Sequence, residues 1–386
     1  MKKTILLIIT LLISTSLFLN GTETRIAALG SEEELLIDDI NVFNYPSSLE
    51  YFVERVIVEY GFYPYSDSFA YFSLLKEMGK FGNIGLVLNK TGIPDYPATS
   101  SSTMIKKPVS LFNILYSLKI NENFTVGISG GYGISASNID EEGTANDVTN
   151  ESCLTSGKVS VSYFWGEAEH LLEIAGGMHQ YEFSYKLGDN FSFNNNNNAS
   201  IDSKGRFFYN LNDYLSIIPF FDYYKVDMSS IEKMGSAIRE IERETTKTRT
   251  GIGINLSPFE ENRLVVGLIY NSTILKKSSA NFDSTITDKS MPAISAGIES
   301  ELKSWFTVRA GITKSFLIHK TESSNGIKSV LTDKTAPFKL NAGLGIRVAS
   351  LEIDAILNED LPFTHGYFIS GEKGNIFTKV SATYLF

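Results

Sequence analysis

Apolar and polar residues alternate along most of the chain after residue 50. In residues 376–386, mostly apolar side chains fill the even positions, whereas Lys379, Ser381 and Thr383 fill odd ones. A period of two indicates a β-strand with one apolar and one polar face. The pattern recurs in about sixteen segments, and fourteen is the alternative because 69–76 and 200–210 alternate weakly. The predicted strands are residues 51–62, 69–76, 81–90, 109–120, 124–136, 157–165, 170–185, 200–210, 214–226, 246–257, 263–276, 291–302, 305–319, 336–349, 350–361 and 374–386.

The connections between these strands alternate in length. Short turns on one rim and long loops on the other are typical of an outer-membrane barrel. The sequence therefore predicts an all-β fold, a membrane-spanning antiparallel up-and-down β-barrel in residues 50–386, because a soluble β-sandwich needs fewer hairpins. A short surface helix is predicted at 229–243 within one loop. The short turns are 121–123, 166–168, 260–262 and 349–350, and the long loops are 91–107, 137–152, 187–199, 227–244, 278–289 and 321–333.

Two hairpins define the predicted register. A turn at 349–350 places Arg347 opposite Glu352 on the inner face, and a turn at 303–305 places Glu299 opposite Arg309. A slip by one residue would set apolar side chains against charged ones. The predicted outward pairs are Val348 with Leu351, Ile346 with Ile353, Leu344 with Ala355, and Leu302 with Phe306. Inward glycines at Gly251, Gly253, Gly343 and Gly345 are expected to let the strands bend.

Composition narrows the class of protein. The 386 residues have a mean hydropathy of −0.02, and no run of about 18 apolar residues follows residue 20, which excludes a bundle of membrane helices. A formal net charge of −10 argues against a nucleic-acid partner. Cys153 is the single cysteine, so no intrachain disulfide forms. Residues 1–21, with Lys2, Lys3 and an apolar core, read as a secretory signal peptide.

Residues 22–49 differ from everything that follows, because they are acidic and show no sustained alternation. They are too charged to face lipid and too few to form a domain. The sequence predicts a plug, or hatch, inside the barrel near its periplasmic side; a disordered periplasmic tail is the alternative. The residues expected to hold it are Arg25, Asp38, Asp39, Asn41 and Asn44, with Pro46 at the turn into the first strand.

The inner face of the predicted barrel carries both signs of charge, which predicts a wet lumen without strong ion selectivity. Pro219 interrupts one strand and marks a candidate gap in the wall, or a bulge. The four histidines lack partners at metal-ligand spacing and no G-x-S-x-G motif occurs, so we expect neither an enzyme nor a cofactor. The predicted lumen-facing residues are Arg55, Glu59, Glu173, Glu299, Arg309, Lys339, Arg347, Glu352, Asp354 and Lys379.

Two stretches carry resemblances. The ending with Tyr384 and Phe386 resembles the assembly signal of outer-membrane barrels, which implies the barrel-assembly machinery as a partner and the outer membrane of a Gram-negative-type bacterium as the location. Residues 25–30 and 38–49 resemble the amino-terminal hatch of the FadL/PorV-like superfamily. Asp38 and Asp39 match its acidic pair, and Pro46, Ser47 and Leu49 match its proline, small residue and leucine, whereas Tyr45 replaces its asparagine.

The resemblance implies a barrel with an inserted plug, surrounded by outer-membrane lipid. FadL-like members pass hydrophobic compounds, so a channel or transporter for small hydrophobic ligands is the first expectation. The alternative is a PorV-like barrel that serves protein secretion or surface attachment, with secreted proteins as partners. A general porin and a barrel hydrolase are weaker alternatives.

Overall fold

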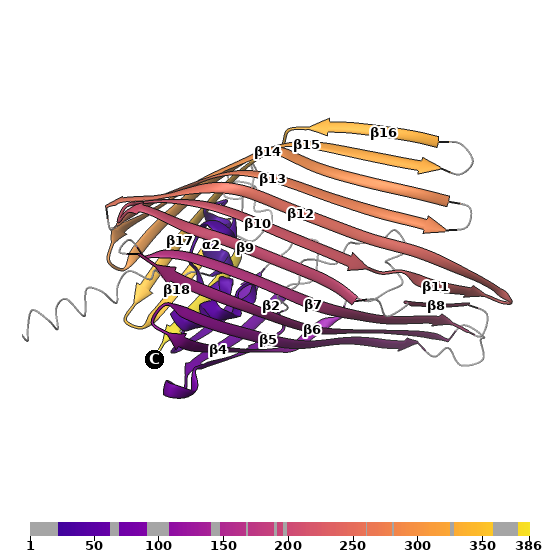
Figure 1. The fold of residues 1–386 in the computed structure, drawn as a ribbon, viewed down its shortest axis with the longest axis horizontal. Helices are drawn as coiled ribbons and strands as arrows, with labels where there is room; N and C mark the ends of the chain where they lie inside the picture. Colours follow the sequence, from indigo (N-terminus) through magenta and orange to yellow (C-terminus); the bar gives the residue numbers. More distant parts are fainter. Residues whose placement is uncertain are drawn as a thin grey trace, which may run out of the picture.

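The computed structural model describes residues 22–61, 69–90, 108–139, 147–166, 169–188, 191–195, 199–259, 261–279, 282–324, 328–357 and 377–386. The predicted signal peptide lies outside these residues. Within them, nineteen strands form one antiparallel sheet, and β19 pairs with β1 from Arg55 opposite Leu385 to Gly61 opposite Lys379. The sheet is therefore a closed barrel (Figure 1).

Six of these strands are pieces of three interrupted ones. β8 and β9 lie in succession along β7, β10 and β11 lie along β12, and β16 and β17 lie along β15. The barrel therefore has sixteen strands, which confirms the predicted number. The strands are β1 Arg55–Gly61, β2 Phe69–Glu77, β3 Asn83–Leu88, β4 Val109–Asn121, β5 Phe124–Ile139, β6 Val148–Trp165, β7 His170–Leu187, β8 Phe191–Asn195, β9 Ala199–Asn212, β10 Leu215–Asp227, β11 Ser230–Met234, β12 Ala237–Phe259, β13 Asn262–Ser279, β14 Phe282–Lys303, β15 Phe306–Ser324, β16 Lys328–Thr335, β17 Phe338–Val348, β18 Leu351–Leu357 and β19 Phe377–Leu385.

The predicted register is confirmed at 349–350, where Arg347 lies opposite Glu352 and all three outward pairs form. At the other hairpin Glu299 lies opposite Arg309, but the predicted pair of Leu302 with Phe306 is wrong. A register shift at Leu302 sets Lys303 opposite Phe306 instead. At Pro219 the ladder to β12 continues through Ile252 without a shift. The ladder to β9 is interrupted at Ile218 and Pro219 and resumes in the same register at Phe220, so the interruption predicted at this proline is confined to the β9 side.

Several predicted loops are strands over much of their length. β6 begins at Val148, and β14 begins at Phe282. The surface helix predicted at 229–243 is wrong, because β11 and β12 form a hairpin there. These parts carry polar residues on both faces, so the alternation that marks a lipid-facing strand is missing from them.

The outer face of the barrel is apolar, and aromatic rings gather where the short turns lie. Trp165 stacks between Tyr163 and Phe207, with ring centroids 5.6 and 5.0 Å apart, and His170 stacks on Tyr209 at 4.8 Å. Such a row is typical of the membrane–water interface of a barrel. The exposed apolar residues farther along the strands include Ile128, Val159, Ile174, Ile252, Leu268, Ile298 and Leu340.

The barrel wall is uneven in height. β12 has 23 residues and β14 has 22, whereas β1 has 7 and β3 has 6. A membrane-spanning strand needs about 9–11 residues. The strands from β5 to β15 therefore reach far beyond the membrane, on the side away from the short turns, as Figure 1 shows.

Residues 22–52, here called the N-terminal segment, fold into short helical turns within the short-turn end of the barrel (Figure 1). Thr22 caps the first of them through its side chain, which accepts a hydrogen bond from the amide of Arg25. Among the described residues, no helix is long and apolar enough to cross a membrane. The turns are α2 Glu23–Ala28, η1 Glu33–Leu35, η2 Asp39–Phe43 and η3 Pro46–Tyr51, and a further turn, η4 Gly79–Phe81, joins β2 to β3.

Candidate functional site

A chain of alternating charges ties α2 to the inner wall. The Arg25 guanidinium donates to both oxygens of Glu299, from Nε at 2.7 Å and from Nη2 at 2.8 Å. Its Nη1 donates to Asp38 at 2.9 Å. Glu299 also accepts from Arg309, which donates to Asp354 at 2.6 Å. Each charge in this buried chain has an opposite neighbour, so removal of one member would leave the next without compensation.

The acidic run Glu32, Glu33 and Glu34 meets two cations of the wall. Arg249 of β12 pairs with Glu32 at 2.7 Å and also with Glu34, and Lys204 of β9 lies 3.5 Å from Glu33. Burial raises the pKa of Glu33, but Lys204 and Arg249 outweigh it and lower that pKa to about 2. Burial, reinforced by Glu33, raises the pKa of Glu34 to about 7 although Arg249 opposes it. The adjacent carboxyl groups of Glu33 and Glu34 therefore have very different pKa values.

Arg206 of β9 contacts both the wall and the N-terminal segment. It donates to Glu173 at 2.6 Å and, on the N-terminal segment, to the Leu36 carbonyl at 2.7 Å and the Asn41 side chain at 3.0 Å. Glu173 in turn accepts from the Ser48 hydroxyl at 2.6 Å. These bonds satisfy backbone carbonyls that the short helical turns leave without intrahelical donors.

Apolar packing and close backbone contact complete this interface. Leu29, Leu35 and Phe43 pack with wall residues in one buried cluster. A Cβ at Gly311 would overlap the Leu29 backbone, and one at Gly343 would overlap Ala28. The inward glycines at these positions therefore make room for the N-terminal segment, a reason additional to strand bending.

The structure places the other predicted segment residues as follows. Asn41 completes a capping box with Asp38, and Pro46 is the first residue of η3. Asp39 is buried, and its Oδ2 lies 3.9 Å from Nη1 of Arg55. Burial, together with the neighbouring Asp38, raises the pKa of Asp39 well above the usual value. Asn44 is also buried, at the end of η2.

Most predicted lumen residues lie on the inner face beside that segment. Lys379 pairs with Glu59 and with Glu23, both at 3.1 Å. Arg347 pairs with Glu352 near the short-turn rim, and Lys339 is exposed. The buried lumen residues are Arg55, Glu59, Glu173, Glu299, Arg309, Glu352, Asp354 and Lys379.

At the end of the chain, the Phe386 amide donates to the Glu54 carbonyl at 3.1 Å, and the Lys76 ammonium lies over the Phe386 ring. Tyr384 points outward, opposite Val56 of β1 and Leu351 of β18. Both residues of the predicted assembly signal therefore take part in the closure of the barrel.

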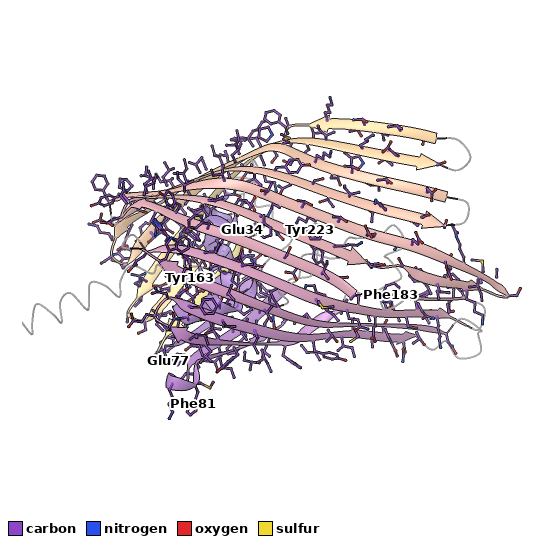
Figure 2. The ribbon with its side chains drawn as sticks, in the orientation of Figure 1. Glu34, Glu77, Phe81, Tyr163, Phe183 and Tyr223 are labelled. Atoms are coloured by element: carbon purple, nitrogen blue, oxygen red, sulfur yellow. The ribbon has the colours of Figure 1, made fainter. Side chains whose placement is uncertain are left out.

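Farther from the short turns, part of the inner wall is apolar, beside buried polar residues such as Asn150, Ser152 and Arg243. Phe183 and Tyr185 share the face of β7 that carries Glu173, and Tyr224 and Val226 share the face of β10 that carries Phe220. They form a second buried cluster, which is separate from the one around the N-terminal segment. Figure 2 shows Phe183 farther along the long strands than Glu34. The members of this outer apolar cluster are Phe183, Tyr185, Phe193, Tyr224, Val226, Met228 and Ile241.

A closed antiparallel barrel with an apolar outer face and an aromatic rim has the architecture of bacterial outer-membrane proteins. The protein therefore has the fold of an outer-membrane β-barrel. Among the described residues, no group of three His, Cys, Asp or Glu side chains could hold a metal ion.

Comparisons with known proteins found likenesses among solved structures only. No family model matches the chain, and no curated protein matches it. Similar solved structures include a Pseudomonas aeruginosa FadL homologue, at 12% identity and a TM-score of 0.46, over 92% of this chain and 96% of that one. The Pseudomonas putida toluene transporter TodX has 9% identity and a TM-score of 0.38, over 89% of this chain and 91% of that one. The ferric yersiniabactin uptake receptor FyuA from Yersinia pestis has 10% identity and a TM-score of 0.38, over 86% of this chain and 80% of that one.

Sequence reasoning missed Lys204, Arg206 and Arg249, the three cations that bind the N-terminal segment most extensively. Each occupies an inward position of a predicted strand, and Glu32 to Glu34 form the one dense acidic run of that segment. These cations could have been predicted as partners of the acidic run, because they were inward cations of predicted strands to which no partner had been assigned.

Proposed function

We propose that this barrel is a channel that carries small hydrophobic molecules across the outer membrane, past the N-terminal segment acting as a plug. The observation that carries the proposal is the outer apolar cluster on the inner wall. A water-filled pore for polar solutes has a polar lining, whereas an apolar lining binds hydrophobic molecules by removing their surface from water.

The plug supports the same function. Buried ion pairs and apolar contacts hold residues 22–52 against the wall at the short-turn end. A plugged barrel limits free diffusion of polar solutes, while a molecule bound on an apolar wall can still move from site to site. Hydrophobic binding scales with the apolar surface that is buried, so selection needs few polar contacts.

The test compares cells that express the full-length barrel with the same cells that lack it. We expect the entry rate of labelled naphthalene across the outer membrane to rise several-fold with the barrel, and that of a small sugar to stay unchanged. Deletion of residues 23–45 should leave a folded barrel that admits the sugar and conducts ions strongly in planar bilayers. Mass spectrometry of the purified barrel should find bound hydrophobic molecules.

Equal rises for naphthalene and the sugar would instead indicate a general porin. No change in either rate, together with secreted proteins that co-purify with the barrel, would favour a role in protein secretion or attachment. Equal conductance with and without residues 23–45 would show that the segment does not obstruct the lumen.

A further inference from the structure

The inner face of β7 has three successive zones. Leu171 and Glu173 belong to the interface with the N-terminal segment. His179 follows, buried at 2% exposure, and Phe183 and Tyr185 of the outer apolar cluster come next. Residues on one face of a strand are about 7 Å apart at each second position. His179 therefore lies between the plug and the apolar cluster, at the inner end of that cluster.

The proton position on His179 is fixed by its neighbour. Its Nε2 is hydrogen-bonded to the Asp202 carboxylate, whose other oxygen lies 3.1 Å from the Lys158 ammonium. A carboxylate only accepts hydrogen bonds, so Nε2 carries the proton. In the neutral imidazole, Nδ1 is then an acceptor. Among the described residues, Nδ1 of His179 is buried and has no hydrogen-bond partner.

Tyr224 supplies the complementary group. It is 3% exposed, its ring centroid lies 6.3 Å from that of His179, and its hydroxyl likewise has no hydrogen-bond partner among the described residues. The two side chains thus present an acceptor and a donor on the inner wall. Tyr224 is itself a member of the outer apolar cluster, so this polar pair and the apolar surface are continuous.

We infer that His179 and Tyr224 anchor the hydroxyl group of an otherwise apolar ligand, an alcohol or a phenol. The ligand hydroxyl donates to His179 Nδ1 and accepts from the Tyr224 hydroxyl, while the apolar body lies against Phe183, Val226 and their neighbours. This inference rests on the proposed transport of hydrophobic molecules and names their class.

Other ligand classes fit the pair less well. A pure hydrocarbon would leave both buried polar atoms without partners, so it would gain neither of the two hydrogen bonds, each worth about tenfold in affinity, that a hydroxyl gains. A carboxylate would set its own acceptor oxygens against the acceptor Nδ1 and near Asp202. A hydroxyl offers both a donor and an acceptor at the same atom, as the pair requires.

The test measures equilibrium binding of 2-naphthol and naphthalene to the purified full-length barrel by their fluorescence. We expect the unaltered barrel to bind 2-naphthol about tenfold more tightly than naphthalene, or more. Tyr224→Phe should weaken 2-naphthol binding about tenfold and leave naphthalene unchanged. Tyr223→Phe is the matched control, because Tyr223 lies next in the strand on the outer face, and it should change neither affinity (Figure 2).

A second variant keeps the inference testable. His179→Phe should also abolish the preference for 2-naphthol, in a barrel whose heat-modifiable migration on gels shows that it is folded; if it does not fold, Tyr224→Phe decides. Equal affinities for both probes in the unaltered barrel, or an unchanged preference in Tyr224→Phe, would overturn the hydroxyl anchor alone. Binding of neither probe would count against the proposed function as well.

Discussion

Arg25 and Glu299 are 274 residues apart in the sequence and are joined by two hydrogen bonds, of 2.7 and 2.8 Å. Both side chains are buried, and the pair links the N-terminal segment to β14 near the short-turn end of the barrel wall. A bidentate contact of this kind fixes orientation as well as distance. It is an attachment of the plug that a single mutation can remove.

Loss of Arg25 should release the plug. Arg25→Leu leaves Asp38 and Glu299 buried with less compensation, which should weaken docking by about 3–5 kcal/mol. The measurement is single-channel conductance, with open events expected to become frequent. Lys76→Met is the control, because the Lys76–Glu54 pair is exposed and worth under about 1 kcal/mol. Closed channels in Arg25→Leu would show that the pair does not hold the plug.

A side chain at Gly127 should also displace the plug. Its Cβ would overlap the backbone of Pro46 and Ser47, so Gly127→Val should weaken docking by about 1–3 kcal/mol. Limited proteolysis of the N-terminal segment checks this, with faster cleavage expected. Gly130→Val is the control, because a Cβ there meets only the Ser156 carbonyl oxygen at 3.8 Å. Equal cleavage of the two variants would contradict the close contact.

Plug docking should weaken as pH rises from about 5 to 8. The pKa of Glu34 is about 7 in the docked plug, above its ordinary value of 4.5, so docking binds a proton. The stabilisation of the docked plug by this proton is fully present below pH 4.5 and is lost as pH rises through 7. The free energy of docking changes by at most about 3 kcal/mol over this range. The groups facing Glu34 are Arg249, Lys204, Glu33 and Glu32.

The pH dependence is measured as the frequency of open events in planar bilayers. Glu34→Gln imitates the protonated carboxyl, so its open frequency should be low and nearly constant across this range. Glu240→Gln, on an exposed part of β12, should keep the pH dependence of the unaltered protein. A persistent dependence in Glu34→Gln would assign the effect to another group.

A charge on the outer face of β17 should destabilise the barrel according to depth. Leu344→Lys lies about half a membrane span from the turn at 349–350 and should cost about 2–4 kcal/mol, whereas Val348→Lys near the rim should cost about 0–1 kcal/mol. Denaturant unfolding in lipid vesicles gives both values. Equal costs at the two positions would place the membrane elsewhere on this strand.

Periodicity predicted the barrel because lipid and lumen impose opposite polarity on successive residues. It located even the weak strand 69–76, and at 349–350 it fixed the register through Arg347 and Glu352. It failed at 229–243, where β11 and β12 stand beyond the membrane and carry polar residues on both faces. The partners of the plug were harder to find, because inward position alone does not say which cations, such as Arg206, lie at its depth.

The contacts of β19 have a consequence for the order of assembly. Ser381 meets the Thr22 hydroxyl at 2.6 Å, and Lys379 pairs with Glu23, so the strand that completes the ring also touches the start of the N-terminal segment. A ring that closed first would force this segment to thread afterwards into a finished cylinder. Closure around a segment already in place needs no such passage, so we expect the segment to lie in place before the final strand pairs, where it would act as an internal template.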